Sequence, residues 1–257
     1  MLLKELKPKH CYNLLRLGKS NDGGYLVEKE SLLNSESLIS CGISRDWSFE
    51  KDFFQFKGCP IHCYDHTIRY SHLKKLSRKS FLKFFNKKYY SKDGIKEILF
   101  NINLYKDYKN FFTEQVVHFE SAVGLGKNLT DMTTIFKKIN SNKIFLKIDI
   151  EGSEYRILDD LIRYQDKIKG LVIEFHNIDL HIERILKFIK NFKLNLCHIH
   201  GQNPGGEDYL DRNGDPIQIE LTFSSYSQYQ DVNPCVPHKL DQSSNPRYKD
   251  VNLKFSI

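Results

Sequence analysis

The sequence predicts an α/β fold built on a mostly parallel sheet, and three observations lead to this expectation. The apolar run at 144–148 is typical of a strand that is buried on both faces of a parallel sheet. Apolar residues then recur at helical spacing from Tyr155 to Ile162. Other strand-like runs alternate with helical segments along the chain, which is the pattern of a doubly wound sheet.

The composition is that of a globular protein large enough to bury a sizeable core, with 257 residues, 40% hydrophobic and 28% charged. The net charge of +7 favours an anionic partner, such as a nucleotide-linked or phosphorylated substrate, or weak association with a membrane surface. Lysine and arginine are spread along the chain, so charge alone does not argue for nucleic acid. The cysteines lack the spacing of a zinc site.

The first ten residues lack the apolar core of a signal peptide. No run of the sequence reaches the ~18 apolar residues of a membrane span. We therefore expect a cytoplasmic protein without a transmembrane segment.

The first half of the chain reads as a nucleotide-binding unit. A strand at 37–43 ends in Gly42, and a helix capped by Asp46 or Ser48 follows it. A second strand at 61–64 ends in Asp65, where an acidic side chain can accept hydrogen bonds from ribose hydroxyls. The turn at 21–25 carries adjacent glycines, which permit close approach of a ligand to the backbone, and residues 1–20 read as a short helix or irregular lead-in.

The later elements extend the same sheet. We expect strands at 114–121, 144–148, 171–175, 194–200 and 217–223, with helices at 132–139 and 180–191. The connection before the last strand is too short for a helix of normal length, so this strand should be antiparallel. Residues 224–257 are polar and read as an extended tail, so residues 1–257 should form a single domain.

The segment 66–115 is an insertion rich in lysine, tyrosine and phenylalanine. It predicts a helix, a loop near Ser91–Gly94 and a further irregular stretch. Basic residues interleaved with aromatics are found in proteins that bind single-stranded nucleic acid. The interpretation we favour is an amphipathic cover on the sheet, with solvated lysines, or a lid over an anionic substrate.

Polar side chains collect where the predicted strands end, at the edge that binds ligands in open α/β sheets. They are Asp65, Asp149, Glu151, Glu174, His176, His198 and His200. Such a group can act as a general base or hold Mg, Mn or Zn, with Asp149, Glu174, His176 and His198 as candidate ligands. The structural alternative is that Glu151 favours a helix start and that some of the histidines are hydrogen-bonded structural residues.

These residues lie in segments that resemble one known family. The segments are RLGKSNDGGYLV, LISCGISRDWSFE, CYDHT, LKIDIEGSEYRIL, VIEFH, HIHGQN and IELTF, in this order between Arg16 and Phe223. The chain resembles the S-adenosylmethionine-dependent methyltransferases of the FkbM type. The resemblance implies the class I Rossmann-like fold, with seven strands and the last one antiparallel. It also implies methyl transfer, usually to an oxygen of a sugar or sugar-like natural product.

The resemblance also implies roles for individual residues. Gly42 would face the methionine part of the cofactor, Asp65 the ribose, and Ser121 and Ala122 the adenine, with Asp149 near the sulfonium and the acceptor. The expected cofactor site is completed by Asp22, Gly24 and Ser48. The catalytic candidates are Asp149, His176, His198 and His200, with Asp149 or Glu174 orienting an imidazole and with Mg or Mn as an optional metal.

Three hypotheses about function follow from the sequence. The first is an O-methyltransferase that acts on a sugar of a surface polysaccharide or on its nucleotide-linked, anionic precursor. The second is an RNA-binding or RNA-modifying protein that uses the basic aromatic insertion. The third is a protein that binds the cofactor without catalysis, which requires that the histidines be dispensable.

Overall fold

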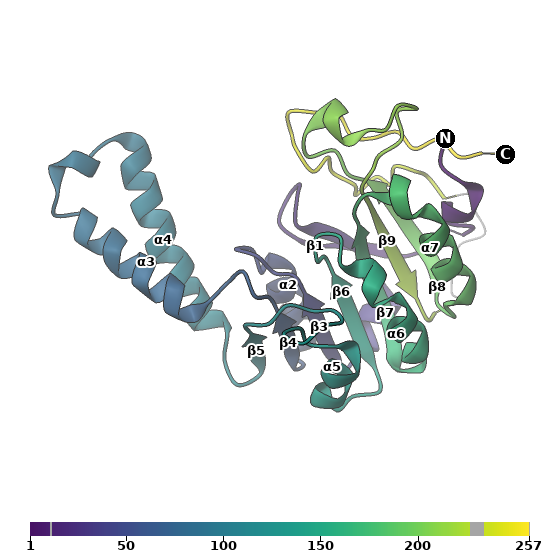
Figure 1. The fold of residues 1–257 in the computed structure, drawn as a ribbon, viewed down its shortest axis with the longest axis horizontal. Helices are drawn as coiled ribbons and strands as arrows, with labels where there is room; N and C mark the ends of the chain where they lie inside the picture. The colour runs from purple at the N-terminus through teal and green to yellow at the C-terminus, as the bar shows by residue number, and fades with distance from the viewer. Residues whose placement is uncertain (11, 227–233, 257) are drawn as a thin grey trace.

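The computed structural model describes residues 1–10, 12–226 and 234–256, and its centre is a seven-stranded sheet (Figure 1). The strand order is β5-β4-β3-β6-β7-β9-β8. The strands are β3 (Ser37–Cys41), β4 (Ile61–Tyr64), β5 (Val116–Phe119), β6 (Ile144–Ile148), β7 (Ile168–Phe175), β8 (Asn195–Gly201) and β9 (Ile219–Ser224). From β5 to β7 neighbouring strands are parallel, whereas β9 is antiparallel to both β7 and β8. The predicted class I methyltransferase fold is confirmed.

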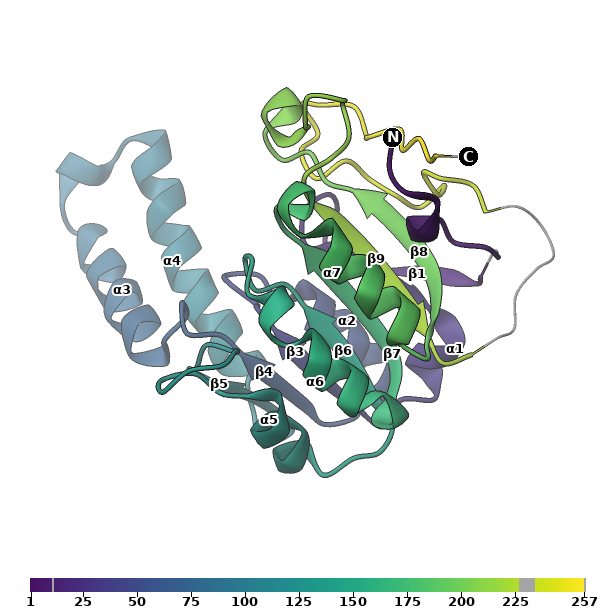
Figure 2. The same ribbon diagram turned by 45° about the vertical axis from the view of Figure 1, so that its right-hand side comes forward.

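Helices cover both faces of this sheet (Figure 2). One face carries α5 (Met132–Ile139), α6 (Leu158–Arg163) and α7 (Ile178–Asn191), and the other carries α1 (Lys29–Leu33) and α2 (Ser48–Lys57). Successive side chains of a strand point to opposite faces. In β6, accordingly, Leu146 joins the apolar core under α5–α7 and Phe145 joins the core under α2.

The N-terminal part differs from the predicted lead-in. Residues Lys4–Leu6 form a single 3-10 turn (η1), and β1 (Leu14–Gly18) pairs with β2 (Gly24–Glu28) as an antiparallel hairpin. The hairpin is tied to the sheet because Thr222 Oγ1 of β9 donates to the Leu26 carbonyl at 2.6 Å. Of the adjacent glycines, Gly23 therefore lies in the turn of a β-hairpin and Gly24 begins its second strand.

The insertion forms a helical arm, which we define as residues 69–111. It consists of α3 (Tyr70–Lys83), the 3-10 turn η2 (Lys87–Tyr89) and α4 (Lys92–Phe111). We expected a loop near Ser91–Gly94 and an irregular stretch, but Ser91 is instead the N-cap of a continuous 20-residue helix. Both views show α3 and α4 lying side by side and extending away from the sheet, so the arm is not a cover packed on it (Figures 1 and 2).

The C-terminal segment 234–256 passes over the edge of the sheet near β8. It contains no helix or strand, and its one β-bridge joins Phe255 to Leu2. Val251 and Leu253 join the core under α5–α7. Of the tail that we expected over 224–257, residues 227–233 and Ile257 lie outside the described part of the chain. Short 3-10 turns complete the described elements: η3 (Glu154–Arg156), η4 (Gln165–Lys167) and η5 (Gly206–Tyr209).

No helix in the described part of the chain has the length and apolarity needed to cross a bilayer.

Candidate functional site

A cavity of about 560 Å³ opens at the carboxyl ends of β3, β4, β6 and β7. Of the residues expected from the sequence, it is lined by Asp22, Gly42, Asp65, Asp149, Glu151, Glu174 and His176. The cavity thus brings together four of the eight expected cofactor residues, Asp22, Gly42, Asp65 and Asp149, and two of the four expected catalytic residues, Asp149 and His176.

Gly42 makes the sharp turn after β3. Its φ is +85°, a left-handed conformation that favours glycine. A Cβ at this position would lie 1.6 Å from the Asp149 carbonyl oxygen, so no side chain fits. The Asp149 N–H in turn donates to the Cys41 carbonyl at 2.9 Å. The end of β3 is therefore in direct backbone contact with the end of β6.

Asp65 organises the loop that follows Gly42. Its Oδ2 accepts from the N–H groups of Ile43 at 2.9 Å and Ser44 at 2.8 Å. Its Oδ1 accepts from the N–H and the hydroxyl of Thr67, both at 2.6 Å. Burial alone would raise the pKa of Asp65, but these hydrogen bonds hold it below the ordinary value. The carboxylate is ionised and its four acceptor positions are all in use by its own chain.

His176 stands at the centre of an acidic wall. Its Nδ1 lies 3.2 Å from Oε1 of the buried Glu154, which also accepts from the Ile150 N–H. Its Nε2 lies 3.4 Å from Glu151 Oε2 and 3.9 Å from Asp149 Oδ1. Burial would lower the pKa of His176, but Glu154 and the other carboxylates raise it above the ordinary value. Glu154 thus orients the ring and directs Nε2 toward the cavity carboxylates.

The acidic wall contains a set of atoms suited to a divalent metal. One ligand atom from each of Asp149, Glu151 and His176 lies within 4.8 Å of the others. Burial and the charge of Asp149 raise the pKa of Glu151, and a cation bound between the two carboxylates would offset this effect. Carboxylate and imidazole ligands suit Mg or Mn, and the set fits such an ion. The other two predicted ligands, Glu174 and His198, lie outside this set.

Tyr25 links two of the carboxyl groups. Its hydroxyl lies 3.0 Å from Asp149 Oδ2 and 3.1 Å from Glu174 Oε2. A hydroxyl carries one proton, so two ionised carboxylates could not both be satisfied by it. Burial, together with the charges of Asp149 and Glu220, raises the pKa of Glu174 well above its ordinary value. The Tyr25 hydroxyl thus lies between the ends of β6 and β7 and can donate its proton to either carboxyl group.

A buried lysine lies beneath the Gly42 turn. Lys147 is on the α2 side of β6, and its Nζ donates to the Gly42 carbonyl at 2.5 Å. Glu50 Oε1 lies 3.9 Å from the same ammonium. Burial alone would lower the pKa of Lys147, but Glu50, Asp149 and Glu174 raise it. Sequence reasoning missed this cation, although a lysine inside an apolar strand run was a signal of a buried, paired charge.

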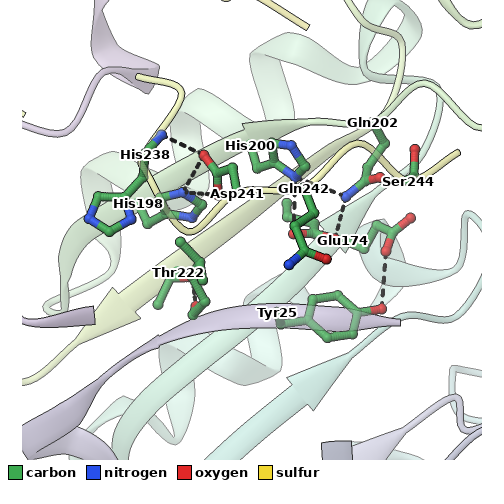
Figure 3. Close-up of polar contacts among 12 residues, drawn as sticks. Tyr25, Glu174, His198, His200, Gln202, Thr222, His238, Asp241, Gln242 and Ser244 are labelled. Carbon is green, nitrogen blue, oxygen red and sulfur yellow. Dashed lines mark hydrogen bonds and ion pairs between the residues drawn. The ribbon is translucent and has the colours of Figure 1, made fainter. Parts of the chain in front are cut away.

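His198 and His200 do not line the cavity. His198 Nε2 lies 2.9 Å from Asp241 Oδ1, and His200 Nε2 lies 2.8 Å from Asp250 Oδ1. Figure 3 shows His198 beside Asp241 and His238, away from the Tyr25–Glu174 pair. The reason is topological, because β9 lies between β7 and β8 and so separates these histidines from the end of β7.

Four of the expected cofactor residues also lie outside the cavity lining: Gly24, Ser48, Ser121 and Ala122. Ser48 Oγ accepts from the Lys19 N–H at 2.9 Å, so it stabilises the hairpin turn that borders the cavity. The loop after β5 is fixed by a contact of 2.5 Å between the hydroxyls of Ser121 and Thr130.

The outer wall of the cavity comes from segments that sequence reasoning did not place there. Phe100 reaches it from α4, and Tyr209 and Gln218 reach it from the region between β8 and β9. Arg45 is exposed at the rim and brings a positive charge. No sequence signal connected these residues, because each depends on how a long connection folds back over the sheet.

The order of the strands, with β9 antiparallel between β7 and β8, is that of the class I methyltransferase fold. The model of the methyltransferase FkbM domain matches residues 7–194, so the chain belongs to the FkbM methyltransferase family. A comparison with curated proteins finds no match.

Among solved structures, the chain is similar to an rRNA methylase from Streptococcus thermophilus at 7% identity and a TM-score of 0.39, covering 76% of this chain and 92% of that one. It is also similar to a precorrin-6y C5,15-methyltransferase from Geobacter metallireducens GS-15, at 10% identity and a TM-score of 0.39, covering 77% and 85%. Scores this low say nothing about the acceptor.

Proposed function

We propose that the protein transfers a methyl group from S-adenosylmethionine to a hydroxyl of a sugar, in a surface polysaccharide or its nucleotide-linked precursor. The observation that carries this proposal is the acidic wall of Asp149, Glu151 and His176, which faces the cavity directly beside the Gly42 turn. Proton-accepting and cation-binding groups would then lie next to the position expected for the transferred methyl group.

The cofactor would lie along the Gly42 turn. Gly42 has no side chain, so the methionine part of the cofactor can approach the backbone closely. The Asp65 carboxylate fixes the conformation of the following loop by accepting from the N–H groups of Ile43 and Ser44. We expect the ribose to replace one of the Thr67 contacts of Asp65, because all acceptor positions of this carboxylate are otherwise occupied. The adenine would lie toward the loop at Ser121 and Ala122.

The transfer itself is an in-line displacement at the methyl carbon. A lone pair of the acceptor oxygen forms the new C–O bond while the S–CH₃ bond breaks, and the sulfur keeps the electron pair as neutral S-adenosylhomocysteine. The hydroxyl proton goes to a base, for which His176 Nε2 is our candidate because Glu154 holds the other ring nitrogen. Asp149, whose Oδ2 accepts from the Tyr25 hydroxyl, would also accept a hydrogen bond from the acceptor and align it.

A divalent cation, if bound, would be held by Asp149, Glu151 and His176. It would lower the pKa of the acceptor hydroxyl and offset the charge of the carboxylates. In that case His176 would act as a metal ligand and not as the general base.

The chemistry of the outer wall supports a polar, anionic acceptor. Tyr209 and Gln218 offer hydrogen-bonding groups of the kind that hold sugar hydroxyls. Arg45 at the rim offers a charge for a phosphate or carboxylate of the acceptor.

The first test is calorimetry of S-adenosylmethionine and S-adenosylhomocysteine with the whole chain, in Mg²⁺, in Mn²⁺ and in EDTA. Saturable binding of either compound supports the cofactor assignment, and tighter binding with a metal than in EDTA supports the metal site. Failure of both compounds to bind would overturn the proposal. A panel of nucleotide sugars, read by mass spectrometry as the gain of one methyl group, then tests the acceptor class.

Asp149→Asn tests the acidic wall. We expect turnover to fall by about 10²-fold or more, because the acceptor loses its ionised partner and the metal set loses a ligand. Asp159→Asn is the matched control, since Asp159 is exposed on α6 and lies outside the cavity lining. Equal turnover of the two variants would remove Asp149 from the mechanism.

A further inference from the structure

The two helices of the arm bury polar side chains between them. Ser77, Ser80 and Asn101 are buried, and the Asn101 amide donates to Ser80 Oγ at 3.1 Å. Leu73 and Tyr108 are buried nearer the root of the arm, where Trp47 and Ile68 join the same apolar cluster. In the outer half of the arm, small polar residues therefore form part of the contact between the two helices. Several large apolar residues of this half are exposed instead.

The tip of the arm exposes a group of large apolar side chains, which we call the apolar tip. Phe81 is 56% exposed, Leu82 67%, Phe85 76% and Tyr90 55%. The rings of Phe81 and Phe85 contact each other edge to face with centroids 5.7 Å apart. Large apolar side chains that are exposed together indicate a surface that a binding partner covers.

A second apolar stripe lies on α4. Ile95 is 37% exposed and Leu99 is 45% exposed, and residues four apart share one face of a helix. The outward-facing side chains thus include aliphatic residues from both helices as well as aromatic ones.

The arm also concentrates the positive charge of the molecule. Residues 69–111 contain twelve Lys and Arg against three Asp and Glu, a net charge of +9. The whole chain carries +7, so the remaining residues sum to −2. Lys79, Lys88 and Lys92 are exposed around the apolar tip. The projecting arm therefore carries both a high positive charge and an exposed apolar surface.

We propose that the arm docks on an anionic phospholipid surface, with the apolar tip inserted among the headgroups and the lysines above the phosphates. Exposed aromatic and aliphatic residues flanked by lysines are the composition of interfacial membrane anchors. Figures 1 and 2 show that the arm extends beyond the body, so its end can reach a flat surface before the sheet does. The arm alone provides both the apolar and the charged part of such a contact.

Two other partners fit these observations less well. Single-stranded nucleic acid is bound by aromatic rings that stack on bases, which does not use Leu82, Ile95 or Leu99. A second copy of the arm is disfavoured because two surfaces of charge +9 repel each other.

The docking would place the cavity near the lipid surface. Phe100, on the same helix as Ile95 and Leu99, lines the outer wall of the cavity and is 50% exposed. A residue from the middle of the arm is thus part of the cavity wall while the tip of the arm is free. An acceptor carried at the membrane would meet the cavity at this wall, and this part of the inference rests on the proposed function.

The test is co-sedimentation of the whole chain with phosphatidylcholine vesicles and with vesicles of equal parts phosphatidylcholine and phosphatidylglycerol. We expect binding only to the anionic vesicles, with a partition coefficient that falls as salt is raised from about 0.1 to about 0.5 M. The triple variant F81S/L82S/F85S and the charge variant K75E/K79E should each lower the partition coefficient about tenfold or more.

The matched controls are Leu180→Ser and K187E/K190E, which alter an equally exposed leucine and two exposed lysines on α7. They should bind vesicles as the native chain does. Binding of S-adenosylhomocysteine, measured on every variant, separates the two proposals, because the arm-tip and α7 residues lie outside the cavity lining. Cofactor binding without vesicle binding would sink the docking proposal and leave the proposed function standing.

Two further results would overturn the docking proposal. One is equal binding of the arm variants and the α7 variants to anionic vesicles. The other is salt-sensitive binding of a single-stranded RNA oligonucleotide, lost in K75E/K79E, together with no binding to vesicles, which would assign the arm to nucleic acid.

Discussion

Tyr25 shows how one hydroxyl can link two acidic strand ends. It is buried and lies between Asp149 and Glu174 at hydrogen-bond distance from both. Burial, followed by the charges of Asp149 and Glu220, raises the pKa of Glu174 well above its ordinary value. The hydroxyl thus joins the end of β6 to the end of β7 in the wall of the cavity.

Replacing Tyr25 with Phe should lower the free energy of unfolding by about 1–3 kcal/mol, because the buried Glu174 and the half-buried Asp149 lose a hydrogen-bond partner. Urea unfolding at pH 7 measures this. Tyr64→Phe is the control, since Tyr64 is equally buried and its hydroxyl finds no partner among the described residues. This second variant should unfold at the native urea concentration or a slightly higher one. Equal losses in both variants would contradict the role given to Tyr25.

At the scale of elements, the arm depends on local capping more than the sheet helices do. Its α4 is 20 residues long and packs mainly on α3, so only its root reaches a larger core. The Ser91 hydroxyl accepts from the Gly94 N–H at 3.0 Å and closes the first turn. The free energy of opening α4 should therefore respond directly to this cap.

Ser91→Ala should lower the local stability of α4 by about 1 kcal/mol, the usual cost of a lost N-cap. Hydrogen exchange resolved by residue measures this as faster exchange in the first turns of α4 with unchanged exchange in β6. Ser91→Asp keeps a capping oxygen and should exchange at the native rate. If exchange quickens in β6 to the same extent, the arm is not a separate unit of stability.

The sequence predicted the elements of the sheet better than those of the arm, for a physical reason. Strands such as 144–148 are buried on both faces, so their apolar runs stand out, and the expected antiparallel last strand was confirmed. In the arm the helix seam buries Ser77, Ser80 and Asn101 while Phe81 and Phe85 face outward. These large apolar residues do not lie on the face where the two helices meet. Their spacing therefore does not identify a helical hairpin, and we expected Ser91 in a loop.

At the scale of the whole molecule, buried charges attach the C-terminal segment to the sheet. His200 Nε2 lies 2.8 Å from Asp250 Oδ1, and its Nδ1 lies 3.6 Å from Glu220 Oε2. Burial would lower the pKa of His200, but Asp250 and Glu220 raise it to about 10. A folded-state pKa above the ordinary 6.5 means that the charged form stabilises the fold. This contribution is complete below pH 6.5 and is lost as the pH rises through 10.

His200→Gln should therefore unfold more easily than the native chain at pH 6.5, and the difference should shrink toward pH 10. The expected loss at pH 6.5 is about 3–5 kcal/mol, the cost of leaving the buried Glu220 and the half-buried Asp250 without their cation. Urea unfolding at a series of pH values gives the difference directly. His72→Gln, on the exposed surface of α3, should follow the native curve. A difference that stays constant with pH would show that His200 is uncharged in the fold.

The sequence placed the acidic strand ends correctly but could not say which histidines share their cavity. Asp149, Glu174 and His176 lie at the ends of the adjacent strands β6 and β7, and their position follows from parallel strand order. His198 and His200 lie near the end of β8. In the sheet β8 is separated from β7 by β9, which comes later in the sequence. A residue pattern within β8 carries no information about where β9 inserts.

The contact of Gly42 with the Asp149 backbone has a consequence for how the protein could acquire a new acceptor. The Gly42 turn and the acidic turn have no side chain between them, so a change in one shifts the other. Evolution or design cannot adjust the two independently. Room to vary the cavity remains at Phe100, Tyr209 and Gln218, which come from the arm and from the region between β8 and β9. A redesign for another acceptor should begin there, with both strand ends left unchanged.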